Sequence, residues 1–201
     1  MREIHYEETS KVINEAKASK KYNVCLGISY TGIVLAVLWV IIFFYTCDFS
    51  KMHPSIIYVF IFEIMFWVLP FVLFIAMFIV FRKIGKKSFT EYDYSFLSGE
   101  VRVAKIPKNS NRYGVIRFQT SNIDRIGKVG SKTYENIAQM PGIKKIKLTV
   151  NEKSSVESDF YYMLIRLEGE KKLLIFDCSE VFISNVLKFC NSRAILEKDY
   201  K

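Results

Sequence analysis

The sequence has little of what most catalytic and metal sites require. Its 201 residues include only 2 histidines and 4 cysteines. The histidines, His5 and His53, both lie outside residues 91–201, and no two cysteines form a C-x-x-C pair. Zinc sites, disulfide frameworks and Ser-His-Asp triads need more of these residues or need them closer together. We therefore expect no metal, no cofactor and no enzyme activity.

Charge is nearly absent from two long stretches near the start of the chain. Residues 24–45 carry none, and residues 56–81 carry only Glu63. As helices these runs reach about 33 and 39 Å, enough to cross a hydrocarbon core about 30 Å thick. The first run is longer than a signal-peptide core and no small-residue cleavage site follows it, so we expect it to be retained. The sequence predicts two transmembrane helices joined by a turn at residues 46–55.

Lysine and arginine flank both runs on the side away from this turn. Five basic residues precede the first run, four follow the second, and the turn has only Lys51. Because basic flanks stay in the cytoplasm, both termini are predicted to be cytoplasmic and the turn external. Residues 1–23 are then a cytoplasmic segment with a short helix starting at Thr9 or Ser10. Residues 82–90 are a basic linker, and 91–201 a cytoplasmic domain.

Small residues recur in the first predicted span. Gly27 and Thr31, and also Gly32 and Ala36, are four residues apart, which lets another helix approach closely. The approaching helix is either the second span of the same chain or a second copy in a homo-oligomer.

Two residues stand out in the second span. Pro70 removes a backbone donor and predicts a kink. Glu63 lies about 10 Å from the outer end of its helix, where a carboxylate can reach interfacial water. Its role is either tolerated packing or contact with an ion or a partner.

The rest of the chain alternates in a way that predicts strands. Tyr92, Tyr94 and Phe96 share one face, and Ser98-Gly99 forms a tight turn. A short helix is expected near residues 132–140. The expected strands span residues 91–97, 100–106, 113–119, 123–129, 144–150, 160–167 and 172–176.

The predicted chain closes with an amphipathic helix near residues 179–190, capped by Asp177 or Ser179. About seven mostly antiparallel strands followed by one helix is the element order of a pleckstrin-homology-like domain. The predicted fold is thus a membrane α-hairpin of two transmembrane helices plus a mainly-β, pleckstrin-homology-like domain closed by a C-terminal helix.

Several segments together resemble a protein family. They are the two-span anchor with its basic stop, residues 91–101, Asp124-Arg125-Ile126, and residues 172–177. The chain is similar over nearly its whole length to bacterial two-span membrane proteins with a C-terminal pleckstrin-homology-like cytoplasmic domain of unknown function. Ser98 and Cys178 depart from that family, which often has asparagine and proline there. The resemblance implies fold and membrane attachment, and no activity or site residue.

Two motifs could be interpreted as functional sites or as ordinary structural features. Residues 127–133 resemble a phosphate-binding loop but lack its two required glycines, so we interpret them as a basic turn. Cys178 precedes a helix N-terminus, which favours a thiolate, but Glu180 opposes one and no histidine is expected nearby. A structural thiol is the favoured interpretation.

The soluble part carries the whole net charge of +9. Next to an anionic leaflet each basic residue adds about 1 kcal/mol of attraction, whereas the alternative is a solvated positive surface. Phosphoinositide recognition is disfavoured because the loop between the first two predicted strands is only Ser98-Gly99. Nucleic acid is disfavoured because no binding motif appears. The candidate contact residues are Arg125, Lys128, Lys132, Lys144, Lys145 and Lys147.

Two functional hypotheses follow. The first is a non-enzymatic scaffold in the cell membrane that presents its basic cytoplasmic domain to a protein partner or to membrane lipid. The second is a small accessory subunit of a membrane transport or envelope complex that acts through its helical hairpin. In that case Glu63, Gly32, Ala36 and Pro70 are the contacts.

Overall fold

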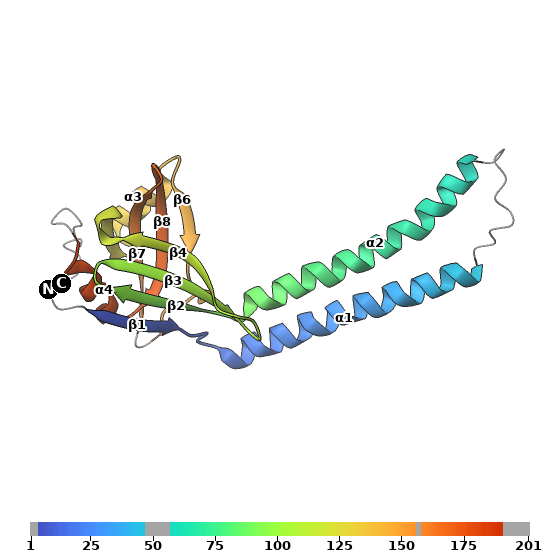
Figure 1. Cartoon of the computed structure of the whole chain (residues 1–201), viewed down its shortest axis with the longest axis horizontal. Coiled ribbons are helices and arrows are strands. Elements are labelled where there is room, and N and C mark those ends of the chain that lie inside the picture. The colour runs from blue at the N-terminus through green and yellow to red at the C-terminus, as the bar shows by residue number, and fades with distance from the viewer. Residues whose placement is uncertain (1–3, 47–56, 156–157, 191–201) are drawn as a thin grey trace. The chain divides into compact units, whose positions relative to one another are not determined.

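The structure, a computed structural model, describes residues 4–46, 57–155 and 158–190 (Figure 1). It divides into two compact units. Residues 1–15 and 89–201 make up the first, which we call the β unit, and residues 16–88 make up the second, the helical hairpin. The first fifteen residues thus group with the β unit.

The hairpin consists of α1 (Glu15–Thr46) and α2 (Ile57–Ser88). Both helices continue beyond the predicted apolar runs. Residues 82–88, expected to be part of a linker, are the last two turns of α2. Within the described residues, Glu15–Thr46 and Met65–Ser88 are long and apolar enough to cross a membrane. The expected turn at residues 46–55 lies almost wholly outside the described residues.

The N-terminal segment contains a strand where we expected the start of a helix. β1 (His5–Ser10) pairs antiparallel with β2 (Thr90–Leu97) over its whole length, and α1 begins only at Glu15. The expectation of a helix starting at Thr9 or Ser10 is therefore wrong. Pairing with a strand 80 residues away decides this conformation, and a local pattern does not contain that information.

Sheet A has the order β1-β2-β3-β4, with β3 (Glu100–Pro107) and β4 (Tyr113–Gln119) completing an antiparallel meander. The hairpin is therefore inserted between the first two strands. Ser10 at the end of β1 lies opposite Tyr92 of β2, so the chain leaves and re-enters the β unit on neighbouring strands. The Ser98-Gly99 turn joins β2 to β3, so the prediction that it joins the first two strands is wrong.

Sheet B has the order β5-β7-β8-β6, in which β6 pairs parallel with β8 and the other pairs are antiparallel. A 3-10 turn, η3 (Thr120–Asn122), connects the two sheets. All seven predicted strands are present, and β1 is the eighth. The remaining elements are β5 (Ile123–Lys128), α3 (Lys132–Gln139), β6 (Lys144–Lys147), β7 (Asp159–Leu167), β8 (Glu170–Cys178) and α4 (Glu180–Leu187).

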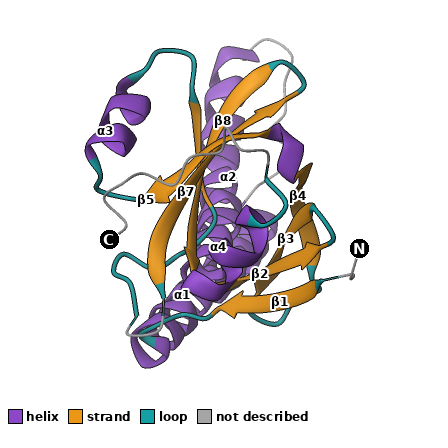
Figure 2. Cartoon of the chain, turned by 90° about the vertical axis from the view of Figure 1, so that its left-hand side faces the viewer, coloured by secondary structure: helices purple, strands orange, loops and turns teal. Residues whose placement is uncertain are grey.

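The core lies between the two sheets, and α4 closes one end of it (Figure 2). Ser179 is the N-cap of α4, since its side chain accepts a hydrogen bond from the Phe182 amide. Phe182 and Val186 are fully buried against the inward-facing aromatics Tyr94 and Phe176. Burial of each such side chain contributes about 1.5–3 kcal/mol to stability. This free energy holds α4 against the end of the core.

Candidate functional site

Three of the six predicted basic contact residues share one face of sheet B. Arg125 of β5 lies in register with Leu164 of β7, Leu164 with Leu173 of β8, and Leu173 with Lys145 of β6. Residues in register point to the same face, so Arg125 and Lys145 flank one surface. Lys147, two residues further along β6, points the same way. The two edges are three strand spacings, about 14 Å, apart.

Helix α3 lies over the centre of this face and supplies Lys132. Its residue Ile137 is buried in a small second core with Tyr162, Leu164 and Leu173. Two further basic residues lie opposite each other on β7 and β8, two positions from those leucines, and so face the same side. We use the name basic face for Arg125, Lys132, Lys145, Lys147, Arg166 and Lys171.

Little of the charge on the basic face is neutralised. Arg166 pairs with Asp124 at 3.4 Å, and the Lys147 ammonium donates a hydrogen bond to the Asn151 carbonyl at 2.7 Å. Among the described residues, the other four members make no ion pair. Within the described ranges, these four side chains therefore keep an uncompensated positive charge.

Lys144 and Lys128 lie elsewhere. Lys144 precedes Lys145 on a strand and so points to the opposite face. The Lys128 ammonium pairs with Asp159 at 2.7 Å. The six predicted residues therefore do not form a single patch. Three lysines on the short edge strand β6 also hinder pairing with another chain, which is a structural role.

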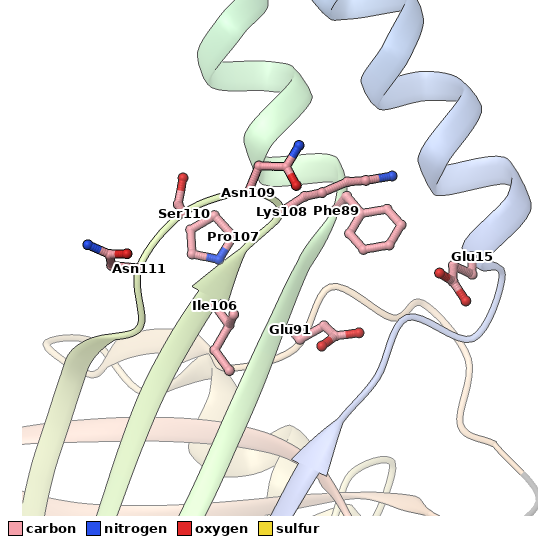
Figure 3. A pocket seen from close by; sticks show the side chains of 9 residues that line it. All are labelled: Glu15, Phe89, Glu91, Ile106, Pro107, Lys108, Asn109, Ser110 and Asn111. Carbon is pink, nitrogen blue, oxygen red and sulfur yellow. The ribbon is translucent and has the colours of Figure 1, made fainter.

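An open pocket of about 380 Å³ lies at the end of sheet A where the chain leaves for the hairpin (Figure 3). The β3–β4 loop forms one side, and the other includes Phe89, Glu15 and Glu91. The Lys108 ammonium lies 4.3 Å from the centre of the Phe89 ring. Two carboxylates against one lysine make this pocket unsuited to a polyphosphate headgroup. Phosphoinositide recognition thus stays disfavoured, for a different reason from the one first given.

Asp177, expected as an alternative helix cap, is instead a buried hydrogen-bond centre. Its side chain is 2% exposed. One carboxylate oxygen accepts hydrogen bonds from Ser10 at 3.2 Å, Thr149 at 3.3 Å and Asn151 at 2.6 Å. The other accepts one from Ser158 at 2.5 Å. These five residues, the Asp177 cluster, join four segments that are distant in sequence.

The Asp177 cluster also holds the connection between β1 and α1. The Asn151 amide group donates to the Lys11 carbonyl at 2.8 Å, and its oxygen accepts from the Ile13 amide at 3.1 Å. The sequence patterns did not predict this arrangement, because the donors come from three other segments. A polar residue at the end of the apolar run 173–176 is its one local signal.

The cysteines of the β unit lack the environment of a nucleophile. Burial raises the pKa of Cys178 well above its ordinary value, and the nearby carboxylates of Glu8 and Asp177 raise it further. Burial raises the pKa of Cys190 to about 11. The interpretation of Cys178 as a structural thiol agrees with this environment.

We expect both thiols to react slowly in the folded protein. With a pKa near 11, Cys190 holds about a hundredfold less thiolate at pH 8 than a thiol of pKa 9.0. Variants that keep only Cys178 or only Cys190 should label with iodoacetamide at least tenfold more slowly when folded than in denaturant. The Cys190 rate should rise with pH up to about 11. Equal native and denatured rates would contradict the burial.

The β unit contains one described histidine, His5, so the expectation that it has none is wrong. His5 lies on β1, is exposed, and its Nε2 is 3.5 Å from the Glu7 carboxylate. Throughout the described ranges, no group of three or more histidine, cysteine, aspartate or glutamate side chains is placed to hold a metal ion.

In the hairpin, the two pairs of small residues differ in burial and in the space around their glycines. A Cβ at Gly32 would lie 2.9 Å from the Phe74 carbonyl oxygen of α2, whereas a Cβ at Gly27 has no atom within 4 Å. Gly32 and Ala36 are buried, and Gly27 and Thr31 are exposed. Of the two alternatives, packing within the chain holds for Gly32 and Ala36.

Pro70 lies inside α2, which stays helical through it and is curved in Figure 1. The Trp39 indole donates to the Trp67 carbonyl, three residues before Pro70, at 2.9 Å. The two indole rings are 5.0 Å apart. The side chain of Glu63 lies outside the part of α2 whose side chains are described, and its role stays a prediction.

Comparison with known proteins links this chain to a bacterial family. The family model described as Bacterial PH-like domain (DUF6106) matches residues 11–196. No curated protein and no solved structure matches the chain. The family description agrees with the predicted pleckstrin-homology-like fold. In the structure this part of the chain has two four-stranded sheets and a C-terminal helix.

Proposed function

The chain belongs to the bacterial PH-like domain family DUF6106, and from that premise we propose that it is a non-enzymatic, membrane-anchored interaction protein. Two transmembrane helices hold it in the cell membrane with both termini in the cytoplasm. The β unit presents the basic face to the acidic surface of a partner protein at the membrane.

The observation that carries this proposal is the register of sheet B. It gathers basic residues from β5, β6, β7 and β8 on one side, while the apolar side of the same strands is buried in the core. Four of the six cations have no ion pair among the described residues. A surplus of unpaired charge on one face steers and orients an oppositely charged partner.

The anionic leaflet is the second candidate partner of the basic face, because each lysine or arginine near it adds about 1 kcal/mol. The shape of the face favours a protein. Helix α3 covers the centre, and a helix layer is about 10 Å thick. The flat surface of a membrane therefore contacts α3 before it reaches Arg125 or Lys145. A partner protein can instead have a surface that fits around α3 and contacts both residues.

Capture of tagged full-length protein from its native membrane tests the proposal. In the double variant Lys145→Ala, Lys147→Ala we expect the yield of an acidic partner to fall about tenfold, since two charges on the basic face are lost. Lys144→Ala is the matched control, because it removes an exposed lysine from the opposite face of the same strand. Equal losses in the control and the double variant would contradict a role for the basic face.

Nanodiscs distinguish the leaflet from a protein partner. If the leaflet is the partner, hydrogen exchange of β6 should slow in nanodiscs with anionic lipid relative to zwitterionic ones, and the double variant should lose this difference. If a protein is the partner, exchange should be the same in both.

The second functional hypothesis, an accessory subunit acting through the hairpin, now has a different candidate surface. The exposed face of α1 with Gly27 and Thr31 is free of α2, whereas Gly32 and Ala36 are occupied by it. Gly27→Leu therefore tests for a helical partner in the membrane. Loss of a co-purifying membrane protein in Gly27→Leu, with the β6 double variant unaffected, would favour this alternative.

A further inference from the structure

The outer edge of β4 is unpaired among the described residues. Sheet A ends at β4, and among the described residues no strand pairs with it on the side away from β3. The strand has 7 residues, a length of about 23 Å. Unpaired backbone donors and acceptors along such an edge are a template for another extended chain.

The other three sheet edges carry features that hinder strand addition. β6 has four residues, three of them lysine. β5 combines a register shift with three charged residues, and β1 carries the adjacent carboxylates Glu7 and Glu8. β4 has a single charge, Arg117, which forms an ion pair with Glu100 of β3.

The surface along β4 is apolar and open. Tyr113 is 49% exposed and Val115 is 40% exposed. A Cβ at Gly114 would meet no atom within 4 Å, so a backbone can approach closely there. A register shift with β3 near this glycine leaves Ile116–Gln119 as the regular part of the edge.

The hydrogen-bond pattern shows which amides of β4 face outward. The Thr120 amide donates to the Gly99 carbonyl at 2.8 Å, next to the pair Glu100 and Gln119. Because bonded and non-bonded pairs alternate in an antiparallel ladder, the amide of Phe118 points to β3. The amides of Arg117 and Gln119 then point to the free edge.

We infer that β4 accepts an extended acidic segment of a partner protein as an additional strand. Arg102 of β3, Arg112 just before β4 and Arg117 of β4 are 47%, 49% and 67% exposed at their side chains. Within the described ranges, two carboxylates, Glu100 and Asp93, pair with these three guanidinium groups, and they are largely buried at 10% and 13%. The surplus positive charge complements acidic side chains on the added strand.

A second copy of this chain fits the edge less well. Pairing β4 with β4 would bring Arg112 and Arg117 of both copies to one shared edge, and like charges across a strand pair are destabilising. The edge is on sheet A and is separate from the basic face of sheet B. The inference therefore does not depend on the function proposed for that face.

A synthetic peptide of alternating valine and glutamate, added to the full chain in zwitterionic nanodiscs, tests the inference. Binding should slow hydrogen exchange of the Arg117 and Gln119 amides at least about tenfold, while Phe118, already bonded to β3, changes little. A peptide of the same length with proline at every valine position should not bind, because it lacks the amides of a paired strand.

Two matched variants sharpen this test. Val115→Glu places an acid on the edge and should weaken peptide binding about tenfold. Val181→Glu makes the same change at an exposed valine of α4, 55% exposed, and should have no effect. If Val115→Glu unfolds, Gln119→Pro replaces it, since it removes one outward amide and leaves the β3 ladder intact.

Several results would overturn the inference. They are no binding of the alternating peptide, protection on another edge strand, or equal effects of the two valine substitutions. Protection of the Arg117 amide that rises with protein concentration without peptide would instead assign the edge to a second copy.

Discussion

Replacing Gly32 with leucine is expected to force the two helices of the hairpin apart. A Cβ at this position would lie 2.9 Å from the Phe74 carbonyl oxygen and 3.3 Å from the Phe78 amide nitrogen. Both are backbone atoms of α2, so no side-chain rotation relieves the clash. We expect a loss of about 1–3 kcal/mol in hairpin stability, the usual range for overpacking.

Gly27→Leu is the matched control for this substitution. Both changes replace an interior helix glycine with leucine, so both gain the same helix propensity, about 0.8 kcal/mol. Gly27 has no atom within 4 Å of its added Cβ, and its leucine would extend into the surroundings. The difference between the two variants therefore isolates packing against α2.

Tryptophan fluorescence measures the outcome without interference from the β unit. The chain has 2 tryptophans, Trp39 and Trp67, and they contact each other across the two helices. In detergent, Gly32→Leu should shift their emission and lower the unfolding midpoint, and Gly27→Leu should leave both unchanged. Similar behaviour of the two variants would refute the close approach at Gly32.

Replacing Asp177 with alanine is expected to be the most damaging single substitution in the β unit. The carboxylate accepts from Ser10, Thr149, Asn151 and Ser158, and all four donors would lose a partner at once. A buried group left without its partner costs about 1–3 kcal/mol. The donors can regain part of this free energy by rearranging toward other acceptors. We therefore expect the free energy of unfolding of the β unit to fall by about 3–5 kcal/mol, a large part of a domain's stability.

Asp159→Ala is the control, because that aspartate forms an exposed ion pair with Lys128 that is worth about 0–1 kcal/mol. Hydrogen exchange of β2, β7 and β8 in the full chain measures the unfolding of the β unit. Exchange should accelerate strongly for Asp177→Ala and hardly change for Asp159→Ala. The Ile13 amide should also exchange faster in Asp177→Ala, since Asn151 holds both groups. Equal behaviour of the two variants would contradict the role of the cluster.

The strands that could be predicted are those with strong alternation. The patterns around Tyr92, Val101 and Tyr161 place β2, β3 and β7 within one or two residues of the observed ends. β1 was missed because His5–Ser10 has almost no apolar alternation and is a strand only by pairing with β2. Because β1 was missed, the hairpin was predicted to precede all the strands, whereas it lies between β1 and β2 in the chain. For the same reason His5 was not assigned to the β unit.

The candidate site was predictable in kind and not in arrangement. A count of charges identifies a basic soluble part, and clusters of lysine identify candidate contacts. Adjacent lysines such as Lys144 and Lys145 are separated onto opposite faces, while Arg125 and Lys145, twenty residues apart, share a face. The pleat and the strand order decide this, and neither is a local property of the sequence.

The amino-acid sequence alone establishes two apolar helices of membrane length and a basic β-rich part. Composition and short-range periodicity suffice for these conclusions, because they depend on solvent preference and on neighbours within a few residues. The tertiary fold sets which strand begins sheet A, which cations share a face, and which strand edge is unpaired among the described residues. The fold also buries Asp177 where four segments meet. These properties depend on pairings across 20 to 170 residues, whose register is set by the packing of the whole unit.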